Sequence, residues 1–387
     1  GSAPDACGCG AGWPVGVSGP HVLLTTDVVG GVWDFCLTLA STLTRCDTAR
    51  VTLLALGEPS LAQRAEAATA GVDLRSAALK LEWMQDSAAD VAATRRLVAS
   101  VARDLQADVI HANQFAAACA EVEVPIVLTL HSDVLSWRRW TLGDRQVPAQ
   151  WQAYVDLVRQ ALSRADAVVA VSRFLAEEVV ARYGVARPIE VIHNGWPAPP
   201  TAVSAPRGGT LLAGRVWDTA KNITLAAQAA RGWHPGQVHL AGDDIHPDGG
   251  RAAIPAPFTA LGFLPRARLD AELQRAAIYL SPARYDPFGL LPLQAALHGC
   301  ALLLSDIPSY RELWTDAALF CAPNDSQDLR RQWQRLLTDE SLRADLQARA
   351  RQRATTCYTA ERMTAAYSAL YTAPTESRAA HRRSVAV

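Results

Sequence analysis

The chain has 387 residues, about twice the usual length of one domain, so two domains of similar size are expected. Half of its residues are hydrophobic and 19% are charged, a composition typical of a globular protein with a sizeable core. A formal net charge of −1 gives no support for a nucleic-acid partner, and no apolar run in the sequence reaches the ~20 residues that a membrane-spanning helix requires.

The first half of the chain alternates short apolar runs, typical of buried strands, with longer helical segments. Strands are expected at residues 22–26, 51–56, 109–111, 126–131, 167–171 and 189–193. Helices are expected at residues 33–45, 90–105, 151–164 and 173–183. Such alternation predicts a parallel sheet covered by helices on both faces, which is the Rossmann-like arrangement.

A segment rich in Pro, Ala, Gly and Ser, residues 197–209, interrupts this pattern and predicts a linker. Further strands are expected at residues 210–213, 238–241, 259–262, 278–281, 301–305 and 319–321. Helices are expected at residues 223–231, 268–276, 307–314, 328–339 and 341–355, with one more directly after Phe288-Gly289-Leu290. We therefore predict an α/β protein of two doubly wound domains, with a cleft between them at the carboxyl ends of both sheets.

The eight cysteines form no C-x-x-C pair and have no histidines clustered near them. This pattern favours reduced, mostly buried thiols in a cytoplasmic enzyme and argues against zinc. The N-terminus lacks the basic segment and hydrophobic core of a signal peptide, which agrees with a cytoplasmic location. Only Cys7 and Cys9 lie in a Gly-rich leader, residues 1–17, which is expected to have no fixed structure.

A strand, a polar break and an apolar helix follow one another between Leu280 and Asp306. The backbone amides of Gly289 and Leu290 would point out of a helix N-terminus that carries roughly half a positive charge, a natural seat for phosphate. A side chain at Gly289 would hold the ligand away from the backbone. Asp286 and Gln294 flank this seat, where one would meet a sugar hydroxyl and the other a ribose hydroxyl. An ordinary strand, turn and helix with Asp286 as a cap is the alternative.

In each expected domain, one glycine-containing segment follows the first strand. Arg215 and Lys221, six residues apart, can set two cations over one diphosphate, although a surface pair around a helix start would look similar. Gly30 and Gly31 allow the backbone to come close to a ligand, or else simply form a tight turn. This segment lacks G-x-G-x-x-G, so a nicotinamide cofactor is poorly supported.

These motifs resemble those of the retaining glycosyltransferases of family 4. Residues 286–290 with Gln294 match the spacing of the signature E-P-F-G-L-x-x-x-E, and Arg215 with Lys221 matches G-R-x5-K. The resemblance extends from about His21 to about Tyr371. It implies the two-domain GT-B architecture, with residues 18–196 as the acceptor domain and residues 197–356 as the nucleotide-sugar donor domain. It also implies that a helix at about residues 357–373 packs back on the first domain, leaving a loose tail at residues 374–387.

The resemblance assigns roles to several residues. It implies catalytic roles for His131, Arg215, Lys221 and Asp286. It places the donor against Gly30, Gly31, Gly262, Phe263, Leu264, Phe288, Gly289, Leu290 and Gln294. The family's matching histidine lies near the transferred sugar, whereas a lone histidine at a strand end is otherwise more often structural. No D-x-D motif occurs in a suitable loop, so neither a metal nor another cofactor is expected.

The sequence departs from the family signature at two positions. Asp286 replaces the first Glu and shortens its reach by one methylene group. Gln294 replaces the second Glu, which in relatives accepts hydrogen bonds from the ribose hydroxyls. A neutral amide loses the charge-assisted part of that interaction, so donor binding is expected to weaken by about 1–2 kcal/mol.

The acceptor side is less specific. Asp27 lies beside the Gly30-Gly31 turn, and Trp33, Trp137, Trp140 and Trp217 are expected in loops that face the cleft. Indole rings stack on sugars, but tryptophans more often serve packing. A basic amphipathic helix at residues 95–105 would suit peripheral contact with the inner face of a membrane, or simply a solvated surface.

These observations predict a retaining, metal-independent hexosyltransferase that uses a nucleotide-diphosphate sugar, a UDP-sugar foremost. The acceptor would be a hydroxyl of a glycan, a lipid-linked saccharide or a small molecule. Two alternatives stay open from the sequence. One is a GT-B sugar-nucleotide epimerase, and the other is a non-catalytic nucleotide-sugar-binding or partner subunit, which Gln294 makes credible.

Overall fold

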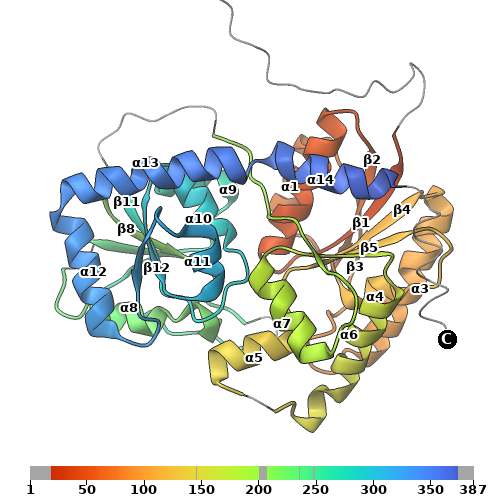
Figure 1. The fold of residues 1–387 in the computed structure, drawn as a ribbon, viewed down its shortest axis with the longest axis horizontal. Coiled ribbons are helices and arrows are strands. Elements are labelled where there is room, and N and C mark those ends of the chain that lie inside the picture. The colour runs from red at the N-terminus through yellow and green to blue at the C-terminus, as the bar shows by residue number, and fades with distance from the viewer. Residues whose placement is uncertain (1–18, 145, 200–206, 235, 247–248, 374–387) are drawn as a thin grey trace, which may run out of the picture.

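The computed structural model describes residues 19–144, 146–199, 207–234, 236–246 and 249–373. The expected leader (1–17) and tail (374–387) lie outside the described residues, as do residues 200–206 of the expected linker. Two α/β domains lie side by side, with the C-terminal domain on the left of Figure 1 and the N-terminal domain on the right.

The described part of the N-terminal domain contains a parallel sheet of seven strands in the order β3-β2-β1-β4-β5-β6-β7. Its strands are β1 (His21–Asp27), β2 (Arg50–Leu56), β3 (Asp73–Ala77), β4 (Val109–Ala112), β5 (Ile126–Leu130), β6 (Ala167–Ala170) and β7 (Glu190–Val191). Every residue of β1 and β5 is buried, because helices cover both faces of the sheet. These helices are α1 (Gly31–Arg45), α2 (Leu61–Thr69), α3 (Ala88–Leu105), α4 (Phe115–Ala118), α5 (Val134–Leu142), η1 (Ala149–Trp151), α6 (Gln152–Arg164) and α7 (Arg173–Tyr183).

The described part of the C-terminal domain repeats this plan with six parallel strands in the order β10-β9-β8-β11-β12-β13. Its strands are β8 (Gly208–Ala213), β9 (Val238–Ala241), β10 (Thr259–Gly262), β11 (Ala276–Ser281), β12 (Ala301–Ser305) and β13 (Leu319–Cys321). Its helices are η2 (Thr219–Lys221), α8 (Ile223–Ala229), α9 (Arg266–Arg275), α10 (Leu290–Leu297), α11 (Pro308–Trp314), α12 (Ser326–Thr338) and α13 (Glu340–Cys357). The predicted fold class of two doubly wound parallel-sheet domains is confirmed.

Six described elements were not expected from the sequence: β3, α2, α4, α5 and the short helices η1 and η2. Strand β3 lies at a sheet edge and is largely exposed, so it has no apolar run to reveal it. Helix α2 begins with a capping box between Ser60 and Gln63, and α5 begins with Asp133 accepting from the amide of Ser136 and ends at the left-handed Gly143. These caps are readable start and stop signals, but the hydrophobic pattern between them is weak.

The strand order fixes where a ligand-binding site can form. In the first sheet the chain moves outward from β1 to β3 and then returns to place β4 beside β1. In the second sheet it moves from β8 to β10 and returns to place β11 beside β8. Loops diverge at the carboxyl ends of such neighbouring strands, and open α/β sheets bind ligands there.

The chain crosses between the domains twice, and the two crossings are hydrogen-bonded to each other. The amide of Trp196 donates to the carbonyl of Tyr358 at 3.0 Å, and the amide of Ala360 donates to the carbonyl of Trp196 at 3.3 Å. After the second crossing, helix α14 (Ala360–Thr372) runs across to the N-terminal domain and packs beside α1.

Helix α14 contributes to the core of the N-terminal domain through two tyrosines. Nδ1 of the fully buried His111 lies 2.7 Å from the Tyr371 hydroxyl, and its Nε2 lies 2.7 Å from the Thr129 hydroxyl. The Tyr367 hydroxyl lies 3.0 Å from that of Thr129. A buried imidazole needs partners for both ring nitrogens, and α14 supplies one of them directly.

A carboxylate of the C-terminal domain caps a helix of the N-terminal domain. Glu312 on α11 accepts hydrogen bonds from the amides of Arg173 at 2.8 Å and Phe174 at 2.9 Å, the first two residues of α7. It also lies 3.0 Å from Nε2 of His193. Burial works to raise the pKa of Glu312, but these hydrogen bonds outweigh it and hold the pKa below its ordinary value.

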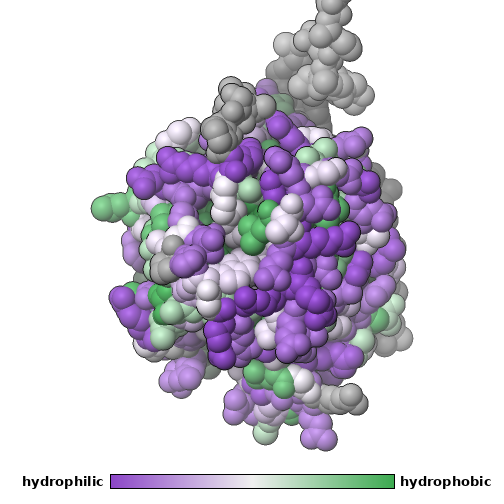
Figure 2. Space-filling view, turned by 90° about the vertical axis from the view of Figure 1, so that its left-hand side faces the viewer, coloured by the Kyte–Doolittle hydropathy of each residue, from purple (hydrophilic) through white to green (hydrophobic). Residues whose placement is uncertain are grey.

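Within the described residues, no helix is both long enough and apolar enough to cross a lipid bilayer. Figure 2 shows the face of the C-terminal domain that looks away from the N-terminal domain. Hydrophilic residues cover most of this face, and the hydrophobic ones form small separate groups. The described residues of this face therefore offer no broad apolar surface to a partner.

Candidate functional site

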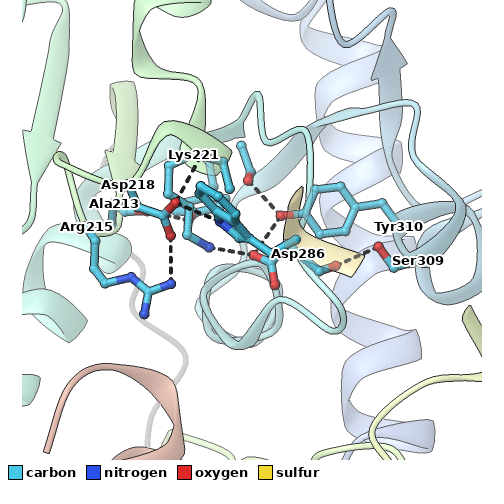
Figure 3. Close-up of polar contacts among 11 residues, drawn as sticks. Ala213, Arg215, Asp218, Lys221, Asp286, Ser309 and Tyr310 are labelled. Carbon is cyan, nitrogen blue, oxygen red and sulfur yellow. Dashed lines mark hydrogen bonds and ion pairs between the residues drawn. The ribbon is translucent and has the colours of Figure 1, made fainter. Parts of the chain in front are cut away.

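The titratable residues singled out from the sequence gather at the carboxyl ends of the strands beside the two reversals of strand order. In the N-terminal domain Asp27 ends β1, and His131 directly follows β5. In the C-terminal domain the segments with Arg215 and Asp286 follow β8 and β11. Figure 3 shows how the side chains of the C-terminal domain point toward one another there.

Asp286 is held by partners from two other segments of the C-terminal domain, η2 and α11. Lys221 donates from Nζ to Oδ2 of Asp286 at 2.9 Å, and the Tyr310 hydroxyl donates to the same oxygen at 3.1 Å. The Ser309 hydroxyl donates to the backbone carbonyl of Asp286 at 2.6 Å. Among the described residues, Oδ1 of Asp286 accepts no hydrogen bond, so it is the oxygen that can bind a ligand.

Tyr310 is itself fixed in place. Its hydroxyl lies 2.7 Å from the Ser281 hydroxyl, at the end of β11. Burial and the charge of Asp286 raise the pKa of Tyr310 well above its ordinary value. The phenol therefore stays protonated at neutral pH and remains a donor to the carboxylate.

Arg215 is oriented by Asp218 and through it by the N-terminal domain. Arg215 donates to Oδ2 of Asp218 at 2.7 Å, and the indole N–H of Trp137 on α5 donates to Oδ1 at 3.3 Å. Burial works to raise the pKa of Asp218, but the charges of Arg215 and Lys221 outweigh it and leave the pKa below its ordinary value. Asp218 is therefore a carboxylate that binds Arg215, feels the charge of Lys221 and links the two domains through Trp137.

The Gly30-Gly31 turn lies against the C-terminal domain. A side-chain carbon at Gly30 would come within 3.2 Å of Nη1 of Arg215, and one at Gly31 would come within 3.2 Å of Cδ1 of Leu290. One turn of the N-terminal domain thus faces both the arginine and the first residue of α10. Asp27, next to this turn, accepts from the amide of Val29 at 2.9 Å, and burial raises its pKa to about 6.

The corner before α10 has the backbone that a phosphate seat needs. Gly289 has φ 82°, and a side-chain carbon there would lie 2.9 Å from Cε1 of Tyr310, so no other residue fits. Within the described residues, the amides of Gly289 and Leu290 donate no hydrogen bond. Phe288 is buried and packs edge-on against Tyr358, with ring centroids 5.8 Å apart. This packing holds the turn before α10 in place.

Gln294 lies on α10 and is 2% exposed. Its side-chain amide makes no hydrogen bond to any residue that the structure describes. The amide nitrogen and oxygen are not fully buried, so they remain open to solvent or to a ligand. This arrangement is compatible with the predicted contact to ribose, which stays a prediction.

His131 is partly buried at the carboxyl end of β5. Its Nε2 lies 2.7 Å from Oδ1 of Asn113, and Phe35 packs edge-on against its ring at 4.6 Å between centroids. Burial lowers the pKa of His131 to about 3, so the ring is neutral at physiological pH.

The expectation that Trp33, Trp137 and Trp140 lie in loops is wrong. Trp33 belongs to α1, is 3% exposed, and donates from its indole to Glu66 at 3.2 Å. Trp137 and Trp140 belong to α5, whose caps were not recognised in the sequence. Trp140 packs against Phe174, with ring centroids 5.3 Å apart, so packing accounts for it. Trp217 alone among the four lies in a loop, near the guanidinium of Arg215.

The remaining donor-site residues lie at the end of β10. Gly262 is the last residue of this strand and accepts from the amide of Gly242 at 2.8 Å. Phe263 is 68% exposed and Leu264 is partly buried, so the side chain of Phe263 is free to meet a ligand. Within the part of the chain that the structure describes, no hydrogen bond joins this segment to Gln294, and its role stays a prediction.

The described residues contain no group of three or more His, Cys, Asp or Glu side chains that could hold a metal ion. A cavity of about 140 Å³ lies at the amino ends of β8 and β9, lined by Gly209, Gln237 and His239 among others. It is at the opposite end of the sheet from Asp286 and Arg215, so it does not belong to this site.

Four residues of the site were not found from the sequence: Asn113, Asp218, Ser309 and Tyr310. Asp218 could have been found, because it stands between Arg215 and Lys221 and caps η2 by accepting from the amide of Ala220. The other three follow β4 and β12, and only the strand order brings these strand ends next to β1 and β11.

Comparison with known proteins agrees with this geometry. Residues 29–197 match the model for Glycosyltransferase Family 4, and residues 252–353 match that for Glycosyl transferases group 1. The chain is 28% identical to the glycogen synthase of Mycobacterium tuberculosis over 298 residues, which cover 70% of each protein.

Two solved structures have a similar fold. The sucrose-phosphate synthase of Thermosynechococcus elongatus has a TM-score of 0.71 at 18% identity, covering 91% of this chain and 98% of that one. The Anabaena protein HepE in complex with UDP-glucose has a TM-score of 0.70 at 19% identity, covering 92% and 100%. The two family models and the two-domain fold together establish that the chain belongs to glycosyltransferase family 4 and is a glycosyltransferase of the GT-B type.

Proposed function

We propose that this protein is a retaining hexosyltransferase that takes a hexose from a nucleotide-diphosphate sugar, a UDP-sugar foremost. The acceptor is a hydroxyl of a glycan, a lipid-linked saccharide or a small molecule. One observation carries the proposal: the Gly30-Gly31 turn lies against both Arg215 and Leu290. The Gly30-Gly31 turn, which carries no side chains, therefore lies next to the guanidinium of Arg215 and to Leu290 at the N-terminus of α10.

The leaving diphosphate is assigned to Arg215, Lys221 and the amides of Gly289 and Leu290. Negative charge grows on the phosphate oxygen as the bond to the anomeric carbon breaks. Donors that are already in place stabilise that charge without reorganisation, at roughly 2.7–4 kcal/mol for one such donor. We propose that these groups replace a metal ion, and unchanged activity after treatment with EDTA is the expected result.

The sugar itself is assigned to Asp286 and His131. Oδ1 of Asp286, left without a partner among the described residues, would accept from a sugar hydroxyl. The acceptor hydroxyl would approach the face from which the diphosphate leaves. Its oxygen forms the new bond to the anomeric carbon, and its proton passes to the departing phosphate oxygen, so the configuration is retained.

The choice of UDP is supported by a protein of similar fold. HepE, which has a similar fold, was solved with UDP and with UDP-glucose.

The cysteines among the described residues are free thiols, mostly buried, which favours a reducing compartment such as the cytoplasm. Peripheral membrane contact through α3 stays a prediction. Arg95, one of the basic residues of this helix, donates to Gln160 on α6 at 2.9 Å, so part of its hydrogen-bonding capacity is used within the protein. Co-sedimentation with anionic vesicles tests it.

The test is a donor screen followed by product analysis. The protein is incubated with UDP-, GDP- and ADP-hexoses, and both thermal stabilisation and release of the free nucleotide are measured. A donor at a hundred times its dissociation constant would raise stability by about 2.7 kcal/mol. The anomeric configuration of the product is then read by NMR. An inverted product, or stabilisation by none of these donors, would overturn the proposal.

A further inference from the structure

Asn113 is fixed in one orientation by Thr25 of β1. Its backbone amide donates to the Thr25 hydroxyl at 3.1 Å, and its side-chain Nδ2 donates to the Thr25 carbonyl at 2.8 Å. Nδ2 also lies 3.3 Å from Sγ of the buried Cys36. A flipped amide would place its oxygen against the Thr25 carbonyl, and two acceptors at that distance repel each other.

This orientation determines which atom of Asn113 faces His131. Oδ1 lies 2.7 Å from Nε2 of the histidine, and an amide oxygen can only accept a hydrogen bond. Nε2 of His131 must therefore carry a proton. The ring is packed edge-on against Phe35 and close to His111, surroundings that disfavour a second proton.

The consequence concerns the other ring nitrogen. In a neutral ring with the proton on Nε2, Nδ1 carries a lone pair and can only accept. Among the described residues Nδ1 of His131 makes no hydrogen bond, and the ring is partly exposed at the carboxyl end of β5. A neutral acceptor at this place fits a hydroxyl hydrogen and disfavours a carbonyl or phosphate oxygen.

We propose that Asn113 is a positioning residue that holds His131 in the Nε2-protonated tautomer, so that Nδ1 accepts a hydrogen bond from a hydroxyl of the transferred sugar. The part of this proposal that concerns the sugar rests on the proposed function. The part that concerns the tautomer does not. The two can therefore fail separately.

The direct test measures the protonation of the His131 ring by NMR and does not depend on enzyme activity. In protein labelled with ¹⁵N-histidine, long-range ¹H–¹⁵N spectra report each ring nitrogen, and His131→Phe assigns the signals of His131. The expected result at pH 7 is an unprotonated Nδ1 and a protonated Nε2, unchanged down to pH 5. A protonated Nδ1 would overturn the proposal, whatever the activity of the protein.

Two variants test the role of Asn113. Asn113→Leu removes the acceptor, so both tautomers of His131 should be populated and kcat/KM should fall about tenfold. Asn113→Asp keeps an acceptor but adds a charge, so His131 should begin to titrate between pH 5 and 8 and activity should fall toward acid pH. If both variants fold and neither changes the ring signals, Asn113 does not set the tautomer.

Gln114→Leu is the matched control. Gln114 is the neighbour of Asn113, is 4% exposed and accepts from the Thr25 hydroxyl at 2.7 Å, but it makes no hydrogen bond to His131 within the described residues. The control should lower thermal stability and leave the ¹⁵N signals of His131 as in the unsubstituted protein. A control that alters those signals as strongly as Asn113→Leu would contradict the assignment to Asn113.

Discussion

Lys221 and Asp286 form an ion pair of 2.9 Å between the group assigned to the diphosphate and the group assigned to the sugar. Both side chains are largely shielded from solvent, at 18% and 14% exposed. In the ligand-free protein each is neutralised by the other, so a donor must compete with Asp286 for Lys221. The pair thus links the two halves of the donor site.

Asp286→Asn should separate these two roles. It removes the charged acceptor for the sugar hydroxyl and releases Lys221. We expect kcat/KM to fall roughly 10- to 100-fold, the equivalent of a hydrogen bond to a charged group. Binding of UDP alone, measured by calorimetry, should stay the same or tighten. Parallel losses in UDP affinity and kcat/KM would mean that Asp286 supports the diphosphate site rather than the sugar.

Gln294→Glu restores the charge that the family signature carries at this position. It should tighten binding of the donor nucleotide by about 1–2 kcal/mol in calorimetry. Because residue 294 is buried, a carboxylate there should also lower the melting temperature of the ligand-free protein. Unchanged or weaker nucleotide binding would show that Gln294 does not face the ribose.

Trp137 and Trp140 offer a matched pair on one helix. Trp137→Phe removes the indole N–H that holds Asp218 and, through it, Arg215. Losing one hydrogen bond of about 1 kcal/mol should lower kcat/KM roughly fivefold. Trp140 has no hydrogen bond from its indole N–H within the described residues, so Trp140→Phe should leave kcat/KM near that of the unsubstituted protein. Equal losses in both variants would argue against the link through Asp218.

Glu312→Gln should destabilise the contact between the domains by about 1–2 kcal/mol, because a weaker acceptor would cap α7. The pKa of Glu312 is depressed in the folded protein, so its contribution is fully present above its ordinary pKa of 4.5 and is lost as pH falls through the lower folded value. Thermal unfolding of both proteins from pH 3.5 to 7 measures this. The difference between them should be constant above about pH 5 and shrink below pH 4.5. A difference that grows toward acid pH would contradict the sign.

Much of the architecture follows from local sequence, because parallel strands buried on both faces need apolar runs. Strands β9, β10, β12 and β13 and helix α7 begin and end where the hydrophobic pattern predicts. Trp137 and Trp140 could not be placed, since an indole beside a polar loop and one inside a capped helix look alike in sequence. The role of Asn113 could not be predicted from the sequence for a different reason. Its importance comes from the pairing of β1 with β4 and β4 with β5, which brings Thr25, Asn113 and His131 together.

The docking of α14 makes the N-terminal domain discontinuous along the chain. Tyr367 and Tyr371 complete the surroundings of His111 and Thr129, yet they are separated from them by the entire C-terminal domain. During synthesis, the N-terminal domain is consequently completed only after the C-terminal domain has been made. A fragment that stops at the first crossing lacks these partners and would leave a buried imidazole without one of its two hydrogen bonds.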